Sequence, residues 1–342
     1  MIYYFYSKQN REVQPVEDEE LNRLAKEKLN LIFQKNHNIP DYFLQNWDKV
    51  ALYDPKGDVE KASSILIEAE KGAYNLDNKL NDLTGKEWIK FTCSWFIFNA
   101  LKDDLKAEKE LDDTTEHHPA TYSPTMISGF INFFTKKGAK VLDPFCGIGS
   151  TLEACKRTDR IGYGIELNPK YFELISKRTP QFKSNIFNTD ASNVLTLNLP
   201  KIDFCISSPP YWDILNRSTK DFKKTRDKKE LDINYSDNET DLGNIDDYDL
   251  FLKKLTKIYL DIYEVLNDNA YLVVIIKNVK KSGKMYPIAW DLARLLNEKY
   301  VLKDEKIWIQ DKIGLAPYGY PFSWTSNILH HYCLIFRKEI SK

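Results

Sequence analysis

The sequence has few of the residues that build metal sites and disulfide frameworks. Its 342 residues include five cysteines and five histidines. No two cysteines form a C-x-x-C pair, and no histidine stands at a matching zinc-binding distance. We therefore expect neither a metal site nor a disulfide framework, and the free thiols fit a reducing cytoplasmic interior.

Long apolar runs and a surplus of one charge are also absent. No apolar run approaches the roughly 18 residues that a membrane helix needs. The first residues, M-I-Y-Y-F-Y-S-K, are too short and too polar downstream for a signal peptide, so we expect a cytoplasmic protein without membrane contact. The net charge is −1, and any surface that binds nucleic acid must therefore be local.

The sequence does contain enough apolar material for a sizeable core. Hydrophobic residues make up 42% of the chain and aromatic residues 13%, and the length fits one large domain or two of ordinary size. From residue 137 onward, strand-like stretches alternate with helical ones, which predicts an α/β fold with a mostly parallel sheet and helices on both faces. Two final strands with no helix between them predict an antiparallel pair at one edge.

Residues 1–110 follow a different pattern and are interpreted as a helical N-terminal region. Helices are expected over three stretches, residues 21–33, 59–70 and 87–101. A capping box formed by Thr84 and Glu87 precedes a helix that would carry three aromatic residues on one face: Trp88, Phe91 and Trp95. Residues 102–116 are charged and fit a linker.

A glycine turn between a strand and a helix marks a candidate ligand site. The stretch V-L-D-P-F-C-G-I-G-S-T covers residues 141–151, and its two glycines allow a tight turn and a close approach of backbone to ligand. Ser150 or Thr151 can cap the helix that follows. The dinucleotide pattern G-x-G-x-x-G is incomplete because residue 152 is a leucine, and the G-K-[ST] of a P-loop is missing.

Two acidic residues follow at the ends of the next strands. Glu166 lies nineteen positions after Gly147, where an acidic side chain can accept hydrogen bonds from ribose hydroxyls. Asp190, in T-D-A, ends the third strand and could meet an adenine ring. Open α/β sheets bind ligands at this edge, which favours a ligand site over a purely structural turn.

A second motif, S-S-P-P-Y-W at residues 207–212, ends the fourth strand beside the glycine turn. Two consecutive prolines lack N–H groups, so their carbonyls are left to face a ligand. Hydrogen bonds from a ring amine to the Ser208 hydroxyl and the Pro209 carbonyl would turn the nitrogen lone pair towards a methyl carbon roughly 3–3.5 Å away. Tyr211 offers a face for stacking the ring. The plain alternative is a turn that ends a buried strand.

These motifs resemble those of the amino-methylating DNA methyltransferases, which use S-adenosylmethionine to make N4-methylcytosine or N6-methyladenine. The resemblance covers about residues 117–338. It rests on the two motifs above, on G-I-E-L-N-P at residues 164–169, and on H-P-A-T-Y-S-P-T-M-I at residues 118–127. It implies a Rossmann-like class I methyltransferase sheet in residues 111–342, with an insertion at 213–247. It also implies S-adenosylmethionine as the cofactor and double-stranded DNA as the partner.

The resemblance also assigns roles to residues. The H-P-A-T segment would shape the methionine end of the cofactor pocket, Glu166 would bind the ribose, and Asp190 would lie near the adenine. The expected cofactor-binding residues are His118, Pro119, Ala120, Thr121, Asp143, Phe145, Gly147, Gly149, Ser150, Thr151, Glu166, Asp190 and Ala191. The expected catalytic residues are Ser208, Pro209, Pro210 and Tyr211. His118 fits a turn better than a metal ligand or general base, because the reaction needs neither.

The order of the motifs departs from the family pattern, because many members with the serine version carry it upstream of the glycine turn. The region that recognises the target sequence therefore cannot be carried over. Three segments are candidates: the N-terminal helices, the 213–247 insertion with its basic run from Arg217 to Lys229, and the aromatic loop at 313–327. Instead of binding DNA, the basic run could simply be a solvated surface. The aromatic loop could instead be a lid packed over the sheet.

The expected function is methyl transfer from S-adenosylmethionine to the exocyclic amine of a flipped base. Cytosine N4 is favoured over adenine N6, because serine rather than aspartate precedes P-P-Y. An RNA guanine-N2 methyltransferase, a protein-glutamine methyltransferase and a non-catalytic binding subunit are the alternatives. The first would carry an RNA-binding domain in front, the second would more typically show N-P-P-Y, and intact motifs argue against the third. The recognition sequence, a cognate restriction endonuclease and the oligomeric state stay open.

Overall fold

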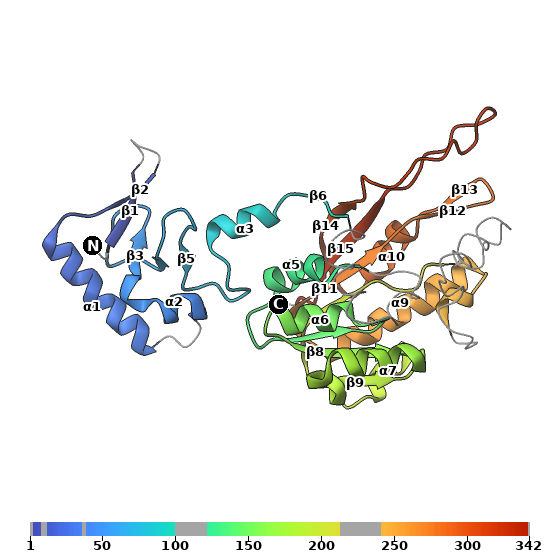
Figure 1. The fold of residues 1–342 in the computed structure, drawn as a ribbon, viewed down its shortest axis with the longest axis horizontal. Helices are drawn as coiled ribbons and strands as arrows, with labels where there is room; N and C mark the ends of the chain where they lie inside the picture. The colour runs from blue at the N-terminus through green and yellow to red at the C-terminus, as the bar shows by residue number, and fades with distance from the viewer. Residues whose placement is uncertain (1–2, 8–11, 36–38, 100–121, 213–240, 341–342) are drawn as a thin grey trace. The chain divides into compact units, whose positions relative to one another are not determined.

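The structure is a computed structural model that describes residues 3–7, 12–35, 39–99, 122–212 and 241–340. The chain divides into two compact units, drawn in Figure 1. The first unit comprises Met1–Cys93 and Asn132–Lys136, and the second comprises Ser94–Ile131 and Lys137–Lys342. The expected linker at 102–116 and most of the 213–247 insertion, including its basic run, lie outside the described residues.

The first unit is built on a five-stranded sheet with the order β2-β1-β3-β4-β5. Its strands are β1 (Tyr3–Ser7), β2 (Glu12–Pro15), β3 (Ala51–Asp54), β4 (Ser64–Leu66) and β5 (Tyr74–Asn75). The helices of this unit are α1 (Glu19–Lys35), α2 (Asp41–Gln45) and α3 (Gly85–Phe91). Helix α1 contributes Ala25 and Leu29 to a core that also contains Phe43, Leu52 and Ile65.

The description of residues 1–110 as helical is therefore wrong in part. The helix expected at 21–33 is present as α1, and the capping box of Thr84 and Glu87 is confirmed at the start of α3. The helix expected at 59–70 is absent; this stretch forms turns and the strand β4. Its apolar residues have helical spacing, but Ile65 and Leu66 pair with Leu52 and Ala51 of β3. Backbone pairing with a distant strand has overridden the local pattern.

The third helix of this region is shorter than expected. It ends at Phe91, and Trp95 lies in the strand β6 (Trp95–Ile97), not on the helix face with Trp88. Strand β6 runs parallel to β14 (Val301–Ile309), with Ile307 opposite Trp95. A pairing across more than two hundred residues cannot be read from a local window.

The second unit carries an eight-stranded sheet with the order β6-β14-β15-β11-β10-β7-β8-β9. Its remaining strands are β7 (Lys140–Asp143), β8 (Ile161–Glu166), β9 (Ile186–Asn188), β10 (Ile202–Ser207), β11 (Leu266–Ile276) and β15 (His330–Arg337). Five neighbouring strands of this sheet, β9, β8, β7, β10 and β11, are parallel to one another. Strand β15 is antiparallel to both of its neighbours, β11 and β14. This is the expected Rossmann-like sheet with its antiparallel strand near one edge, extended by β6.

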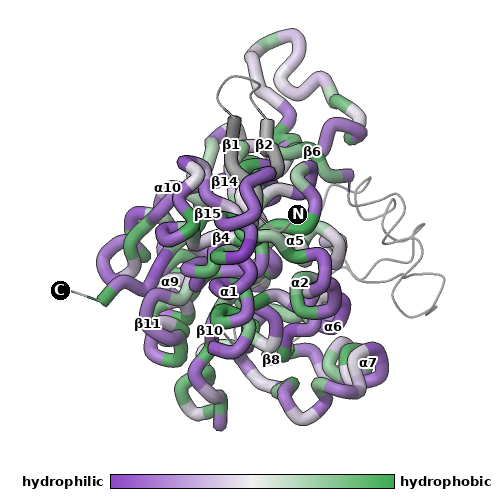
Figure 2. The backbone as a smooth tube through the Cα atoms, turned by 90° about the vertical axis from the view of Figure 1, so that its left-hand side faces the viewer, coloured by the Kyte–Doolittle hydropathy of each residue, from purple (hydrophilic) through white to green (hydrophobic). Residues whose placement is uncertain are grey.

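Helices alternate with these strands along the chain and cover the sheet. They are α5 (Pro124–Phe134), α6 (Ser150–Arg157), α7 (Pro169–Arg178), α9 (Tyr248–Val265) and α10 (Ile288–Leu296). Helices α9 and α10 share one core with β10, β11 and β15. Figure 2 shows hydrophobic and hydrophilic residues alternating along α7, as expected of a helix with one buried face. No helix among the described residues combines the length and apolar character needed to span a bilayer.

Residues 310–329 join β14 to β15 as an arm that extends beyond the sheet (Figure 1). The packed lid considered for the aromatic loop at 313–327 is therefore wrong, because its aromatic side chains are exposed. A short hairpin lies beside the base of the arm and is formed by β12 (Val279–Lys281) and β13 (Lys284–Tyr286).

Candidate functional site

The glycine turn between β7 and α6 is held by its backbone. Gly147 and Gly149 have φ angles of 55° and 87°, which L-residues with side chains rarely adopt. The Gly149 N–H donates to the Cys146 carbonyl at 2.9 Å. Gly149 is itself the N-cap of α6, with no side-chain cap. The expected capping by Ser150 or Thr151 is therefore wrong.

Asp143 is the last residue of β7 and directly precedes this turn. It is fully buried and accepts hydrogen bonds from the Tyr122 hydroxyl at 2.8 Å, the Thr151 hydroxyl at 2.5 Å and the Phe145 N–H at 3.0 Å. Burial raises the pKa of Asp143 to about 6, although these hydrogen bonds act in the opposite direction. Asp143 thus ties the turn to α6 and to the segment before α5.

Glu166 ends β8 and faces the turn from the next strand. One carboxyl oxygen accepts from the Gly147 N–H at 2.7 Å, and the other from the Asn168 N–H at 2.8 Å. Burial raises the pKa of Glu166 to about 8, while the two hydrogen bonds lower it. A carboxyl group keeps acceptor positions beyond these two bonds whether or not it is protonated, so Glu166 can still accept hydrogen bonds from a ligand.

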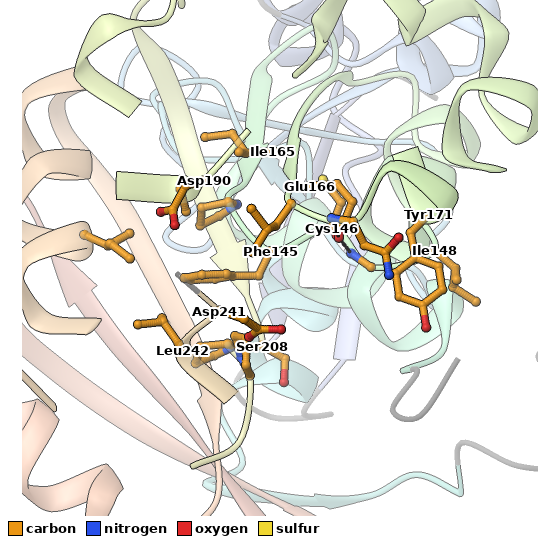
Figure 3. A pocket seen from close by; sticks show the side chains of 18 of the residues that line it. Phe145, Cys146, Ile148, Ile165, Glu166, Tyr171, Asp190, Ser208, Asp241 and Leu242 are labelled. Carbon is orange, nitrogen blue, oxygen red and sulfur yellow. Dashed lines mark hydrogen bonds between the residues drawn. The ribbon is translucent and has the colours of Figure 1, made fainter. Parts of the chain in front are cut away.

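A pocket opens at this edge of the sheet, lined by residues at or just after the ends of β7, β8 and β10. Figure 3 shows its lining; Asp241, Leu242 and Ser208 lie at one end in this view. The predicted residues that line it are Phe145, Gly147, Ser150, Glu166, Asp190, Ala191, Ser208, Pro209, Pro210 and Tyr211. Three others, Asp143, Gly149 and Thr151, are not part of the lining. His118, Pro119, Ala120 and Thr121 lie outside the described residues.

The two serines of S-S-P-P-Y-W have different surroundings. Ser207 is fully buried, and its hydroxyl lies 2.8 Å from the Tyr259 hydroxyl of α9. Ser208 comes directly after β10 and lines the pocket together with the two prolines and Tyr211. The packing of Ser207 against α9 therefore leaves Ser208 as the serine that faces a ligand.

Tyr211 is held by a histidine that sequence reasoning missed. Its hydroxyl lies 3.0 Å from Nε2 of His331 in β15, and the His331 ring stacks on Trp308 of β14 at 4.4 Å between centroids. Burial lowers the pKa of His331 to about 3 and raises the pKa of Tyr211 to about 12. Both groups are therefore neutral near pH 7, and the contact orients the tyrosine ring.

Further lining residues were also missed. Tyr122, Tyr171, Asp241, Leu242 and Ile258 all line the pocket. Asp241 and Leu242 come at the acidic end of the insertion, where no motif marks them. Tyr122 directly follows the H-P-A-T segment, so its position in the motif could have identified it.

The pocket suits a ligand that has both a sugar and a flat ring. Glu166 can accept from hydroxyl groups. Phe145, Ile165 and Leu242 supply apolar surface, and Asp190 supplies a carboxylate at the same edge. These residue types fit the ribose and the adenine of S-adenosylmethionine, the cofactor implied by the motifs.

Comparisons with known proteins agree with this chemistry. A family model described as DNA methylase matches residues 2–177, about half of the chain, and its match ends before S-S-P-P-Y-W. The Type II methyltransferase M.Cfr9I of Citrobacter freundii is 37% identical over 75 residues, which cover 22% of this chain and 25% of the relative. The Type II methyltransferase M.BglI of Bacillus subtilis is 30% identical over 120 residues, which cover 34% of this chain and 31% of the relative.

These matches span between a quarter and a third of each relative. Among solved structures, TrmN from Thermus thermophilus has 14% sequence identity and a TM-score of 0.39, and the match covers 64% of this chain and 50% of TrmN. The family model matches about half of the chain, and this match assigns the chain to the family. The chain belongs to the DNA methylase family, and S-adenosylmethionine is the cofactor that accompanies this membership.

Proposed function

We propose that this chain is a DNA methyltransferase that transfers a methyl group from S-adenosylmethionine to the exocyclic amine of a base flipped out of duplex DNA. One observation carries the proposal. The residues suited to the cofactor, Glu166 and Phe145, line the same pocket as Ser208, Pro209 and Tyr211. A site for the donor thus adjoins a site for a ring amine.

One group of pocket residues would bind the methyl donor, and a second group would orient the amine that accepts the methyl group. Glu166, with Gly147 and Asp190, would hold the nucleoside part of the cofactor, which supplies an electrophilic methyl group when bound. Ser208 and the Pro209 carbonyl would accept hydrogen bonds from the amine, so that its lone pair is directed towards the methyl group. Tyr211 would stack the ring, with its hydroxyl fixed by His331.

The base must leave the helix to reach this site. An amine in a stacked base pair cannot approach a donor bound at a sheet edge, so the enzyme extrudes the nucleotide. We favour cytosine N4 over adenine N6, because the family resemblance associates a serine before P-P-Y, rather than an aspartate, with cytosine. Names of relatives such as Type II methyltransferase also suggest a companion restriction endonuclease.

Expression in a host free of DNA methylation tests the proposal directly. The modified bases of the host DNA are mapped, and N4-methylcytosine at one recurring sequence is the expected result. N6-methyladenine at such a sequence would move the preference to adenine and keep the activity. Purified protein that binds the cofactor but labels only RNA with a tritiated methyl group would contradict the choice of DNA.

A further inference from the structure

The arm between β14 and β15 has an ordered tip with large aromatic side chains on its surface. Tyr320, Phe322 and Trp324 are 81%, 95% and 87% exposed. Exposed rings in such a cluster usually mark a surface that meets a partner.

Hydrogen bonds hold the arm in shape. The Gln310 N–H donates to the Leu329 carbonyl at its base. Farther out, the Asn327 side chain accepts from the Ala316 N–H at 3.0 Å and donates to the Ala316 carbonyl at 2.9 Å. At the tip, the Phe322 N–H donates to the Gly319 carbonyl at 2.8 Å. The exposed rings are therefore presented by a folded element.

The hairpin of β12 and β13 contacts the arm and carries positive charge. Lys280 donates to the Ser326 carbonyl at 2.7 Å and to its hydroxyl at 2.9 Å. Residues 279–286 contain three lysines and no aspartate or glutamate. We call residues 279–286 the lysine hairpin and residues 313–327 the aromatic arm.

Both elements border the S-S-P-P-Y-W segment. The Lys281 ammonium lies 4.8 Å from the centroid of the Trp212 ring. The aromatic arm leads directly into β15, whose second residue, His331, contacts Tyr211. A partner of the arm and hairpin would therefore lie against the proposed base site.

We propose that the lysine hairpin and the aromatic arm together grip duplex DNA, with the hairpin on the phosphates and the arm tip inserted between bases beside the target. The inference rests on the proposed function and assigns the step that opens the helix. The lysines of the hairpin match the charge of a phosphate backbone. Large apolar side chains are the ones that proteins wedge between base steps, and a flipped base leaves a gap that such rings can fill.

The test of the arm uses the double substitution Phe322→Ala and Trp324→Ala in the full chain. Both side chains are exposed, so the fold should be retained. A matched control is Trp95→Ala, which removes a 52% exposed tryptophan from the edge strand β6. Methyl transfer is measured at a target sequence mapped with the wild-type protein, on a paired duplex and on one whose target base faces an abasic position.

We expect the arm variant to lose about tenfold or more in kcat/KM on the paired duplex. On the duplex with the abasic position, where no base pair has to open, its rate should return to within about threefold of the wild-type rate. Cofactor affinity and the Trp95→Ala control should match the wild type.

The lysine hairpin is tested by Lys281→Gln with Lys284→Gln, with Lys280 kept because it holds the arm. The slope of log affinity for DNA against log salt should fall by about two units. The control pair Lys177→Gln and Lys183→Gln removes the same charge from exposed positions near the C-terminal end of α7 and should leave the slope unchanged.

Four outcomes would overturn the inference. Full activity of the arm variant on the paired duplex would show that the arm does not open the helix. An equal loss of activity on both duplexes would show that the arm acts in the methyl-transfer step instead. A hairpin variant with an unchanged salt slope removes the phosphate contacts. An arm variant that changes self-association in sedimentation velocity but keeps its DNA affinity makes the arm a protein interface. If the wild type labels no DNA at all, the proposed function itself fails, which distinguishes that failure from the others.

Discussion

Two carboxyl groups at the carboxyl ends of β7 and β8 show how residues of one type acquire different tasks. Asp143 is enclosed by Tyr122, Thr151 and the Phe145 N–H, and it stabilises the turn. Glu166 is bonded by backbone N–H groups on one side and lines the pocket on the other. Glu166 is therefore the carboxyl group placed to meet a cofactor.

Replacing Glu166 with alanine tests that role. The change removes the proposed acceptors for two ribose hydroxyls, and hydrogen bonds of this kind contribute roughly 1–3 kcal/mol. Calorimetry should show a cofactor affinity weaker by that amount. Glu166 would leave the site if the variant bound the cofactor as tightly as the wild type.

The pKa of Glu166 predicts how stability changes with pH. Because burial raises this pKa from 4.5 to about 8, the folded protein binds the proton more tightly than the unfolded chain. This contribution to stability is fully present below pH 4.5 and is lost as pH rises through about 8. In denaturant titrations between pH 4.5 and 8, the free energy of unfolding should fall less steeply for Glu166→Gln than for the wild type. Parallel curves would mean that Glu166 does not titrate in this range.

Tyr211 and its contact with His331 can be separated by two substitutions. Tyr211→Ala should lose a stacking face that contributes about 1–3 kcal/mol per base, and methylation of duplex DNA should fall accordingly. Tyr211→Phe keeps the ring and loses the hydroxyl that lies 3.0 Å from His331, so a smaller loss in kcat is expected. Cofactor affinity should change little in both. Methylation by Tyr211→Ala near the wild-type rate would show that the base pocket is elsewhere.

At the scale of elements, close packing between β8 and the glycine turn brings Glu166 to the pocket. A Cβ atom on Gly164 of β8 would lie 2.4 Å from the Cys146 sulfur and 3.3 Å from a Leu152 methyl group. The Cys146 N–H also donates to the Ile165 carbonyl at 3.1 Å. The strand and the turn can approach this closely only because residue 164 has no side chain.

Gly164→Ala should therefore destabilise the protein by about 1–3 kcal/mol, the usual result of overpacking a core. Gly129→Ala in α5 is the matched control, because its Cβ would meet no atom within 4 Å and alanine favours a helix. Urea unfolding should show a lower midpoint for Gly164→Ala and an equal or higher one for Gly129→Ala. Equal midpoints for wild type and Gly164→Ala would mean that the turn can shift to accommodate the added Cβ atom without a loss of stability.

For the whole molecule, a net charge of −1 means that the proposed DNA contacts must come from local groups of basic residues. The lysine hairpin is one such group. The basic run from Arg217 to Lys229 is a second; it lies outside the described residues, so its role stays a prediction. It follows the S-S-P-P-Y-W segment in the chain by a few residues.

Replacing Lys223, Lys224, Lys228 and Lys229 with glutamine should weaken DNA binding and flatten its salt dependence. Each lost phosphate contact lowers the salt slope by about one unit. Filter binding at several salt concentrations measures the slope, and cofactor binding serves as the control. Unchanged affinity and slope would direct attention to the N-terminal unit, whose role in recognition stays open.

The sequence by itself determined the strands from β7 onward in the sheet of the second unit, and the motifs that meet at its edge. Strands and helices from residue 140 onward are marked by short, strong local signals, such as the apolar run of β10 and the glycines before α6. Residues at the carboxyl ends of parallel strands must meet at one edge. Glu166 and Ser208 could therefore be assigned to one pocket before the fold was known.

The tertiary structure alone decided the features that depend on partners far away in the chain. The apolar residues of 59–70 have helical spacing, yet part of this stretch pairs with β3. Trp95 was expected in a helix but lies in a strand that pairs with β14. His331 contacts Tyr211 across 120 positions in the chain, and Asp241 lines the pocket from the acidic end of the insertion. Backbone pairing and burial between residues far apart in the chain compete with the local preference for helix or strand. A sequence pattern that spans a few helical turns carries no information about these distant partners.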